Sequence, residues 1–423
     1  MNLHKTTLFV LAIASLAACQ QKEPPQQQQS AVEAYSDSLT MELTEIHKQG
    51  HINGFSVAIV NQNEVLFQAG IGYSNLNTKA SYTENTIQNI GSVSKTFIGI
   101  ALLKAQEMGK LSLDDPINKH LPFQVYNPNY PSEDITIRHL ATHTSTILDT
   151  DYYNEKSYIL KEDIEVPDSI MAMSEEFNAP TSTMPLVSFL EKLLSDKSEW
   201  YDEQGFLQNK PGELYEYINV GAALAAAIIE IVTGESYNEF ATKHILQPLH
   251  MSSSSWSFDE VDMTKHSTLY ARPTIELPFY SLITYPDGGL KTSISDMANY
   301  LSELIKGYYG NGTILHSASY SELFRAQLTS EHIPDQDEAG DPYDDEYNTG
   351  IFMGFTPKGY VGHTGGDPGI ATFMFFNPKS KTGKVMMINT SVRGSAGVKE
   401  FYDIWYTLDD YENKMKLNDS NQK

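Results

Sequence analysis

The sequence predicts an α+β fold, an α/β sandwich in which strands from both ends of the chain form one antiparallel sheet. Near the N-terminus, the apolar runs Phe55–Val60 and Val65–Ala69 are separated by a short polar segment, which is typical of a strand hairpin. Between residues 89 and 288 the chain shows helical patterns and long loops. Strand-like runs return only near the C-terminus, at Gly359–His363, Thr372–Phe376 and Lys384–Asn389. We therefore expect a sheet lobe made of residues 31–88 and 289–412, with an all-helical lobe, 89–288, inserted between its halves.

Several segments carry helical spacing of apolar residues or signals of helix ends. Residues 97–103 are apolar on every side, so the helix expected from about Ser92 to Met108, ended by Gly109, should be buried between layers. The first and last helices of the chain should flank the sheet. The other expected helices are 31–46, Thr136–Thr142, Val220–Val232 ended by Gly234, one opened by the capping box Ser236–Glu239, Ser295–Ile305 and Gly397–Leu408.

The composition excludes several classes of protein. Hydrophobic residues make up 40% of the 423 residues, which is enough to bury a large core, so the chain is neither disordered nor fibrous. Acidic side chains number 54 and basic ones 29, so most of the surface would repel phosphate backbones and anionic lipids. Nucleic acid is therefore not an expected partner.

The first 18 residues are typical of an export signal. Lys5 precedes the apolar stretch Leu8–Leu16, which is too short to remain in a membrane as a helix. Cys19 is the only cysteine, and its context Leu-Ala-Ala-Cys resembles the lipobox at which bacterial lipoproteins are cut and lipidated. We expect lipidation of Cys19, with simple secretion and a chance cysteine as the alternative.

Both ends of the mature chain should be polar. Residues 19–30 are rich in glutamine and proline and should form a flexible tether, and residues 413–423 should form a polar tail. The folded body would then hang from a bacterial membrane on its extracytoplasmic side, in the periplasm.

A serine and a lysine three residues apart, Ser92 and Lys95, stand just before the apolar helix. If Ser92 starts that helix, the two side chains share one face, and the lysine can reach the serine hydroxyl. A serine becomes a nucleophile when a neighbour takes its proton, which a partly buried lysine can do. Ser92 is therefore a candidate acylation site. Serine is also an ordinary helix N-cap, and the same S-x-x-K spacing recurs at Ser420–Lys423 in the polar tail.

An acyl-transfer site also needs a proton shuttle and an oxyanion hole, and two later stretches supply candidates. Tyr217 and Asn219 form a Y-x-N pair that enters a small-residue helix after a Pro-Gly turn. Y-x-N occurs five times in the chain, but only this copy has that context. A later predicted strand contains the run His363, Thr364, Gly365 and Gly366. Its two glycines allow a substrate to approach the backbone closely.

Together these motifs resemble those of the serine hydrolases built like class C β-lactamases and low-molecular-weight penicillin-binding proteins, and the likeness covers about residues 40–408. In that family S-x-x-K holds the nucleophile and its lysine, Y-x-N supplies a phenol and a substrate-binding amide, and [KH]-T-G lines the pocket. The segment Thr144–Ile147 departs from the family's T-S-G-L, which affects one loop and leaves the catalytic set intact. The resemblance implies the catalytic residues Ser92, Lys95 and Tyr217 and the substrate-binding residues Asn219, His363, Thr364, Gly365 and Gly366.

The resemblance also implies a mechanism. Ser92 would attack a carbonyl while Lys95 and Tyr217 relay its proton. The backbone N–H groups of Ser92 and Gly366 would hold the oxyanion, and Asn219 would bind a substrate amide. Tyr217 would then activate water for deacylation.

The substrate is less closely defined. Histidine at position 363 is only partly charged near neutral pH, and His-Thr-Gly is common among the family's D-peptidases, so we expect D-amino-acid peptides or related cell-wall fragments, with β-lactam acylation as a side activity. A carboxylesterase acting on small esters, and a catalytically silent protein that binds peptidoglycan fragments, are the alternatives. Arg393 is a candidate for binding a substrate carboxylate, beside the more usual role of a surface salt bridge.

Neither a metal ion nor a cofactor is expected, and the chain should act as a monomer. His139 and His143 stand four residues apart but lack an acidic ligand. The acidic stretch 335–346 matches a calcium-binding loop poorly, because its fifth position is Ala339.

Residues 149–210, rich in acidic and aromatic side chains, should border the pocket rather than build the core.

Overall fold

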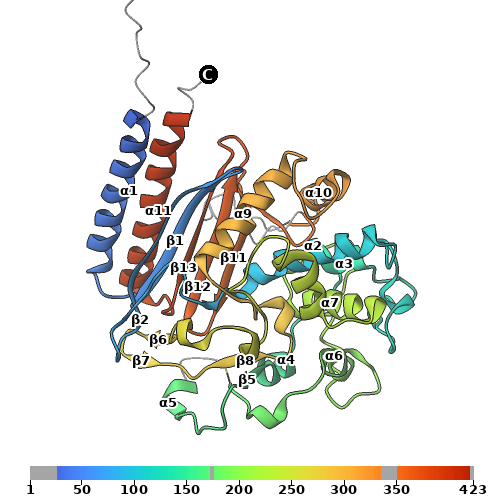
Figure 1. The fold of residues 1–423 in the computed structure, drawn as a ribbon. Coiled ribbons are helices and arrows are strands. Elements are labelled where there is room, and N and C mark those ends of the chain that lie inside the picture. The colour runs from blue at the N-terminus through green and yellow to red at the C-terminus, as the bar shows by residue number, and fades with distance from the viewer. Residues whose placement is uncertain (1–25, 172–175, 335–349, 420–423) are drawn as a thin grey trace, which may run out of the picture.

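A computed structural model of the chain describes residues 26–171, 176–334 and 350–419 (Figure 1). The export signal, Cys19 and the acidic stretch 335–346 lie outside the described residues. The expectations about them stay predictions.

A seven-stranded antiparallel sheet joins the two ends of the chain. Its strand order is β10-β11-β12-β13-β1-β2-β3, so β1 from the N-terminal part pairs with β13 from the C-terminal part. In this pairing Phe55 lies opposite Ile388 and Asn61 lies opposite Thr382. The predicted fold class and the origin of the sheet are confirmed. The strands are β1 (Gly54–Asn61), β2 (Val65–Asn75), β3 (Ala80–Ser81), β10 (Gly354–Phe355), β11 (Val361–Asp367), β12 (Ile370–Asn377) and β13 (Thr382–Ile388).

Helices cover both faces of this sheet. The terminal helices α1 (Gln26–His47) and α11 (Gly394–Asp419) lie side by side on one face, and α9 (Ile294–Tyr308) packs on the other (Figure 1). The alternation of β1 explains the two layers, because Val57 packs toward the terminal helices and its neighbour Ala58 packs toward α9 and the helical lobe. Every residue of β1 is buried, as expected for a central strand.

The terminal helices are longer than the sequence analysis predicted. α1 begins at Gln26, so the tether predicted at 19–30 is partly helical, which is consistent with the good helix propensity of glutamine. α11 runs to Asp419, so the polar tail predicted at 413–423 is helical over most of its length. Buried Tyr411 and Met415 extend the apolar face of α11 at helical spacing and account for this difference.

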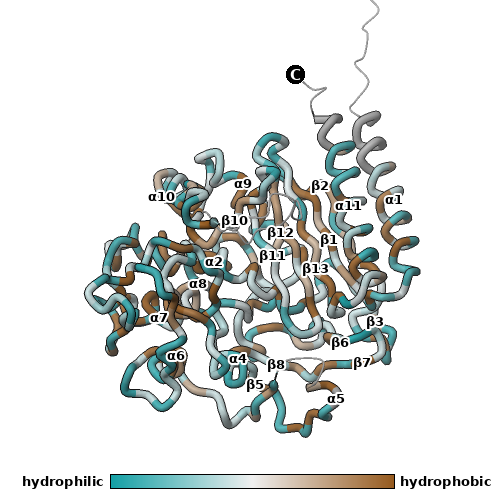
Figure 2. Tube along the Cα trace, turned by 180° about the vertical axis from the view of Figure 1, so that it is seen from behind, coloured by the Kyte–Doolittle hydropathy of each residue, from teal (hydrophilic) through white to brown (hydrophobic). Residues whose placement is uncertain are grey.

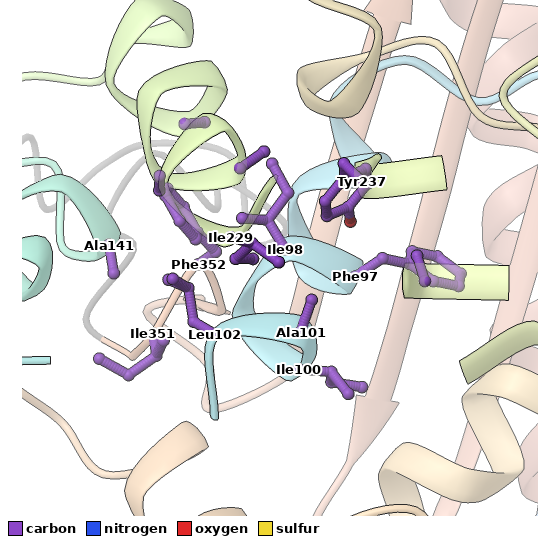
Figure 3. Packing of buried hydrophobic residues seen from close by; sticks show 14 of the residues in the cluster. Phe97, Ile98, Ile100, Ala101, Leu102, Ala141, Ile229, Tyr237, Ile351 and Phe352 are labelled. Carbon is purple, nitrogen blue, oxygen red and sulfur yellow. The ribbon is translucent and has the colours of Figure 1, made fainter. Parts of the chain in front are cut away.

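The helical lobe is built around α2 (Ser94–Glu107), which is buried along nearly its whole length as its apolar sequence predicted. Figure 3 shows Phe97, Ile98 and Leu102 of α2 packed among side chains from α7 (Asn219–Thr233), α8 and the segment that holds Phe352. The other helices are α3 (Ile137–Ala141), α4 (Asp151–Ser157), α5 (Asp168–Met171), α6 (Leu186–Leu194), α8 (Tyr237–Ala241) and α10 (Ser317–Leu323). Single helical turns occur at η1 (Gly91–Val93), η2 (Ile117–Lys119), η3 (Pro180–Ser182), η4 (Thr242–Leu246), η5 (Phe258–Glu260), η6 (Met263–Lys265) and η7 (Tyr285–Asp287).

This lobe contains short strands, so the prediction that it is all-helical was wrong. β5 (Tyr158–Leu160) pairs with β8 (Tyr280–Leu282) across more than a hundred residues of sequence. Each strand has only three residues, too few to show an alternating pattern, although aromatic and branched side chains favour strands. Two further pairs join β4 (Gln88–Asn89) to β9 (Lys291–Thr292) and β6 (Tyr270–Arg272) to β7 (Ile275–Glu276).

Hydrophobic residues concentrate inside the molecule. In Figure 2 the strands of the sheet and α7 carry hydrophobic segments, whereas the outer loops are mostly hydrophilic. No single helix in the described part of the chain is long and apolar enough to cross a membrane, and α7 with Tyr237–Leu246 reaches that size only as a pair bent by 83°.

Candidate active site

Ser92 and Lys95 lie together where the chain enters α2. Ser92 belongs to the turn η1, two residues before the first residue of α2, rather than to the α-helix itself. This turn begins at Gly91, whose φ of +55° is a backbone conformation that favours glycine. Nζ of Lys95 is 2.9 Å from Oγ of Ser92, and Lys95 is fully buried while Ser92 is partly exposed. The serine is thus accessible from outside, whereas the lysine is enclosed.

Lys95 is held from three sides. Besides Ser92, its ammonium donates to Oδ1 of Asn219 at 2.7 Å and to the backbone carbonyl of Asp287 at 2.9 Å. A protonated lysine has three N–H donors, and these three acceptors match them. The neutral amine fits equally well, because it keeps two N–H groups for Asn219 and Asp287 and turns its lone pair to the hydroxyl of Ser92.

Asn219 is oriented by a carboxylate from a distant loop. Oδ2 of Asp149 accepts a hydrogen bond from the Asn219 side-chain amide at 2.8 Å, and the same carboxylate accepts from the backbone N–H groups of Asn219 and Val220. Asp149 therefore caps the positive N-terminal end of α7 and turns Oδ1 of Asn219 toward Lys95. No local pattern in the sequence indicates this role, because 70 residues separate the two partners.

Tyr217 contacts His143, which the sequence analysis weighed as a metal ligand and disfavoured. The two rings stack with centroids 4.6 Å apart. Nδ1 of His143 accepts from the backbone N–H of Ile218 at 3.2 Å, and the His143 carbonyl accepts from that of Glu216 at 2.8 Å. His143 thus contacts three successive residues centred on Tyr217, and its own φ of +56° places its ring for this purpose. Burial, aided by the charge of nearby Lys95, holds the pKa of His143 well below its usual value.

The four residues of the His-Thr-Gly-Gly run all lie on β11, and this strand packs against the turn η1. The two backbones touch: a Cβ atom built on Gly365 would lie 2.1 Å from the carbonyl oxygen of Ile90, and one on Gly91 would lie 2.9 Å from the backbone nitrogen of Gly366. Only glycine fits at either place. This contact brings the backbones of Ser92 and Gly366 next to each other, although they are far apart in sequence.

His363 lies behind this edge. It is buried, and its Nδ1 donates to the carbonyl of Thr364, so in the neutral ring Nε2 is the acceptor. Its ring centroid is 6.1 Å from that of Tyr217, which makes it the third ring in a row with His143.

A cavity of about 300 Å³ opens onto these residues. It brings together the predicted residues Ser92, Tyr217, Asn219 and Gly366, whereas Arg393 is exposed between β13 and α11 and does not line it. The full lining is Ser92, Tyr153, Asn154, Tyr158, Tyr217, Asn219, Leu282, Asp287, Gly288, Gly366 and Asp367. Tyr153, Asn154 and Tyr158 border the pocket, as expected of the segment 149–210. The expectation that this segment does not build the core was wrong, because the apolar face of α6, with Phe189 and Leu190, is buried in the main hydrophobic core.

One wall of the cavity is acidic. Asp287 accepts a hydrogen bond from the hydroxyl of Tyr153 at 3.1 Å, and Asp367 accepts one from that of Tyr158 at 2.7 Å. Burial raises the pKa of the Asp287 carboxyl to about 7, although the charge of Lys95 opposes this shift. Burial also raises the pKa of both tyrosines, so their hydroxyls keep their protons. Within the described residues, no three His, Cys, Asp or Glu side chains are grouped so that they could hold a metal ion.

The chain is similar to known sequences over most of its length. A sequence profile of the Beta-lactamase family matches residues 30–408. Protein flp of Staphylococcus aureus (strain MRSA252) is 26% identical over 347 residues, which are 81% of this chain, and the chain spans 60% of that protein's length. A Beta-lactamase of Yersinia enterocolitica is 23% identical over 385 residues, covering 86% of this chain and 88% of that protein.

Two solved structures share the fold. The octameric penicillin-binding protein homologue from Pyrococcus abyssi has a TM-score of 0.67 and 26% identity, over 89% of this chain and 76% of that one. The penicillin-binding protein from Bacillus halodurans has a TM-score of 0.61 and 21% identity, over 87% of this chain and 98% of that one. The first neighbour is described as an octamer, which lends no support to the monomer expected here. With the family profile covering most of its length and this fold beneath it, the chain belongs to the Beta-lactamase family.

Proposed function

We propose that the chain is a serine hydrolase that opens amide or ester bonds through an acyl-enzyme on Ser92. The observation that carries this proposal is the contact of 2.9 Å between Oγ of Ser92 and Nζ of Lys95, at the floor of a cavity that Tyr217 and Asn219 also line. A buried lysine that touches a partly exposed serine is the arrangement that serine activation requires.

The proposed first step forms the ester. Oγ of Ser92 attacks the substrate carbonyl carbon, and its proton passes to neutral Lys95 or to the phenolate form of Tyr217. The backbone N–H groups of Ser92 and Gly366 would stabilise the negative charge on the carbonyl oxygen. The bond to the leaving amine or alcohol then breaks, and the leaving group takes the proton.

The second step removes the acyl group. Water attacks the Ser92 ester while Tyr217 accepts a proton from it, and collapse of the intermediate returns that proton to Oγ of Ser92. The products are a carboxylic acid and the free serine. His143 holds Tyr217 in place for both steps.

Small peptides of D-amino acids, or related cell-wall fragments, are the proposed substrates, with β-lactam acylation as a side activity. The cavity volume of about 300 Å³ is at the small end of the range for ligand sites, which suits a short acyl group. Asn219 keeps an amide N–H that can bind a substrate carbonyl, because its side chain gives only one hydrogen to Asp149.

A mass measurement tests the acyl-enzyme directly. A fluorophosphonate, which phosphonylates activated serines, should add its mass once per chain of the full-length protein. Ser92→Ala should lose this adduct, while the matched variant Ser321→Ala, on the exposed surface of α10, should keep it. An adduct that persists in Ser92→Ala contradicts the proposal.

A substrate panel separates the related possibilities. It compares D-peptides, L-peptides, a cephalosporin and short esters at equal concentration. A short ester hydrolysed far faster than any D-peptide would indicate a carboxylesterase. No labelling of Ser92, together with retained binding of a peptidoglycan fragment, would indicate a binding protein.

We also propose that the mature protein is a lipoprotein attached through Cys19 to the extracytoplasmic side of a bacterial membrane. The support is the lipobox-like sequence that precedes this cysteine. Labelled palmitate should enter the wild-type protein in the membrane fraction and should not enter Cys19→Ser. Incorporation into Cys19→Ser would contradict the anchor.

A further inference from the structure

A second cavity lies on the other face of the two-stranded ribbon that β5 forms with β8 (Figure 1). Its volume is about 510 Å³, within the range of small-molecule sites. In the ribbon Tyr158 lies opposite Leu282, and Ile159 lies opposite Ser281. Successive side chains of a strand point to opposite faces, so Tyr158 borders the active-site cavity whereas Ile159 and Ser281 border the second one. Ser92 is not among the described residues that line this second cavity.

Aromatic side chains form much of the wall that faces the ribbon. Trp256, Phe258 and Tyr285 all line the second cavity. Trp256 is only 3% exposed, and its ring packs edge-on against that of Tyr237, with centroids 5.1 Å apart. Its indole N–H has no hydrogen-bond acceptor within the part of the chain that the structure describes. The wall therefore offers flat apolar surface and a donor that a ligand could satisfy.

A buried cation lies directly behind this wall. Lys291 is fully buried, and its ammonium donates to the backbone carbonyls of Trp256 at 3.0 Å and of Gly289 at 3.2 Å. It also lies over the ring of Phe258, 4.2 Å from the centroid. These contacts are all with neutral groups. Burial lowers the pKa of Lys291 to about 7, although the charge of Asp367 opposes this shift, so a further anion close to Lys291 would favour its protonated form.

A second cation stands at the mouth of the cavity. Lys161 directly follows β5 and lines the cavity. Its ammonium is 3.7 Å from a carboxylate oxygen of Glu162, whose side chain is 69% exposed, and such surface pairs are weak. Asp259 is the acidic residue that lines the cavity, and it too is exposed to solvent. Water screens these two carboxylates more strongly than it screens buried Lys291, so the wall favours a negative ligand.

We propose that the second cavity binds a small organic anion with an aromatic body, such as an aryl carboxylate or an aryl sulfonate. The aromatic body would lie against Trp256 and Phe258, and the anionic group would be held by Lys161 at the mouth and by Lys291 behind the wall. A neutral molecule of the same shape would bind more weakly, because it leaves both ammonium groups without a counter-charge. This proposal does not depend on the proposed hydrolysis by Ser92.

The test uses two fluorescent probes that share one ring system. 8-Anilinonaphthalene-1-sulfonate carries a negative charge, and N-phenyl-1-naphthylamine lacks the sulfonate. In titrations of the full-length wild-type protein we expect Kd to be at least about tenfold lower for the sulfonate, which corresponds to about 1.4 kcal/mol. In Lys291→Met, which keeps an unbranched side chain in the buried place, the sulfonate should bind several-fold more weakly, while Kd of the neutral probe stays the same. Lys161→Gln should act in the same direction without disturbing the interior.

Lys48→Gln is the matched control, because it removes one positive charge from the exposed surface just after α1. It should keep both wild-type Kd values, which would exclude an effect of net charge alone. Ser281→Trp should fill the second cavity from the ribbon and abolish the binding of both probes. Equal Kd values for the two probes in the wild type, an unchanged preference in Lys161→Gln, or retained binding in Ser281→Trp would each overturn the inference.

A last measurement separates the two cavities. Protein labelled at Ser92 with the fluorophosphonate should bind the sulfonate with the same Kd as unlabelled protein, because the label occupies the other face of the ribbon. Loss of probe binding on labelling would place the probe in the active-site cavity and would refute the second site. Failure of the labelling itself would refute the hydrolase and leave the comparison of the two probes intact.

Discussion

The two sides of the cavity differ in how they are made. On the catalytic side, Ser92, Lys95 and Asn219 form one hydrogen-bonded chain at the ends of two buried helices. On the acidic side, Asp287 and Asp367 accept hydrogen bonds from tyrosines of the short helix α4 and the short strand β5. The catalytic side is anchored in the hydrophobic core, whereas the acidic side rests on polar contacts between segments distant in sequence.

The two sides are expected to have different roles, one in the reaction and the other in the choice of substrate. On the catalytic side, the proposed activation of Ser92 by Lys95 would serve many acyl groups. The acidic side contacts Lys95 through the backbone carbonyl of Asp287, whereas its carboxyl groups take part in none of the proposed proton transfers. Changes on the catalytic side should therefore alter the rate for every substrate. Changes on the acidic side should alter which substrates are hydrolysed faster than others.

The largest expected effect comes from loosening the catalytic side at His143. His143→Ala removes the ring stacked on Tyr217 and the acceptor for Ile218, so kcat for a short ester should fall about 10- to 100-fold with little change in KM. His143→Asn keeps an acceptor and tolerates the positive φ, so it should recover part of kcat. Steady-state kinetics with thermal unfolding of both variants are the measurement. An equal loss of kcat in the two variants, or a loss confined to KM, would contradict a positioning role.

The next effect concerns the cap of α7. Asp149→Ala removes the acceptor for the backbone N–H groups of Asn219 and Val220, and we expect the free energy of unfolding to fall by about 1–2 kcal/mol. The urea midpoint should decrease with an unchanged m-value. Asp259→Ala, at an exposed turn, serves as the control. Equal midpoints for Asp149→Ala and the wild type would show that the carboxylate does not support the helix.

The smallest effect concerns the acidic side and depends on pH. Because the folded-state pKa of Asp287 is raised to about 7, the stability that its protonated form contributes is complete below its unfolded pKa and is lost as pH rises through about 7. Asp287→Asn cannot ionise, so its stability relative to the wild type should increase from pH 5 to pH 8, by on the order of 1 kcal/mol. Urea unfolding at both pH values measures this. A stability difference that is the same at pH 5 and pH 8 would mean that Asp287 titrates at its ordinary value.

The sequence predicted those parts of the molecule that local patterns encode. Strands β1 and β2 alternate or are continuously apolar over many residues, and α2 and α7 are long apolar segments that end at glycines with positive φ, Gly109 and Gly234. The site residues Ser92, Lys95, Tyr217 and Asn219 occur in short spaced motifs. Ser92, Tyr217 and Asn219 line one cavity, and Lys95 contacts Ser92 and Asn219.

The contacts that orient the site residues leave no local pattern in the sequence. Asp149 meets Asn219 across 70 residues, and Tyr158 meets Asp367 across 209. These carboxylates and phenols look like any polar residues of a surface loop until the strands bring them together. His143 was visible only as one of two histidines four residues apart, and its stacking on Tyr217 depends on the positive φ that follows α3.

The contact between Gly91 and Gly366 also sets the order in which this protein can become active during its synthesis. Ser92 leaves the ribosome 274 residues before Gly366. Until β11 has been made and has paired with β12, the nucleophile has no second N–H group to hold the charge of a reacting carbonyl. An unfinished chain would therefore carry Ser92 without the second N–H group of the proposed oxyanion site, and the proposed hydrolysis would have to wait until the chain beyond Gly366 has been made.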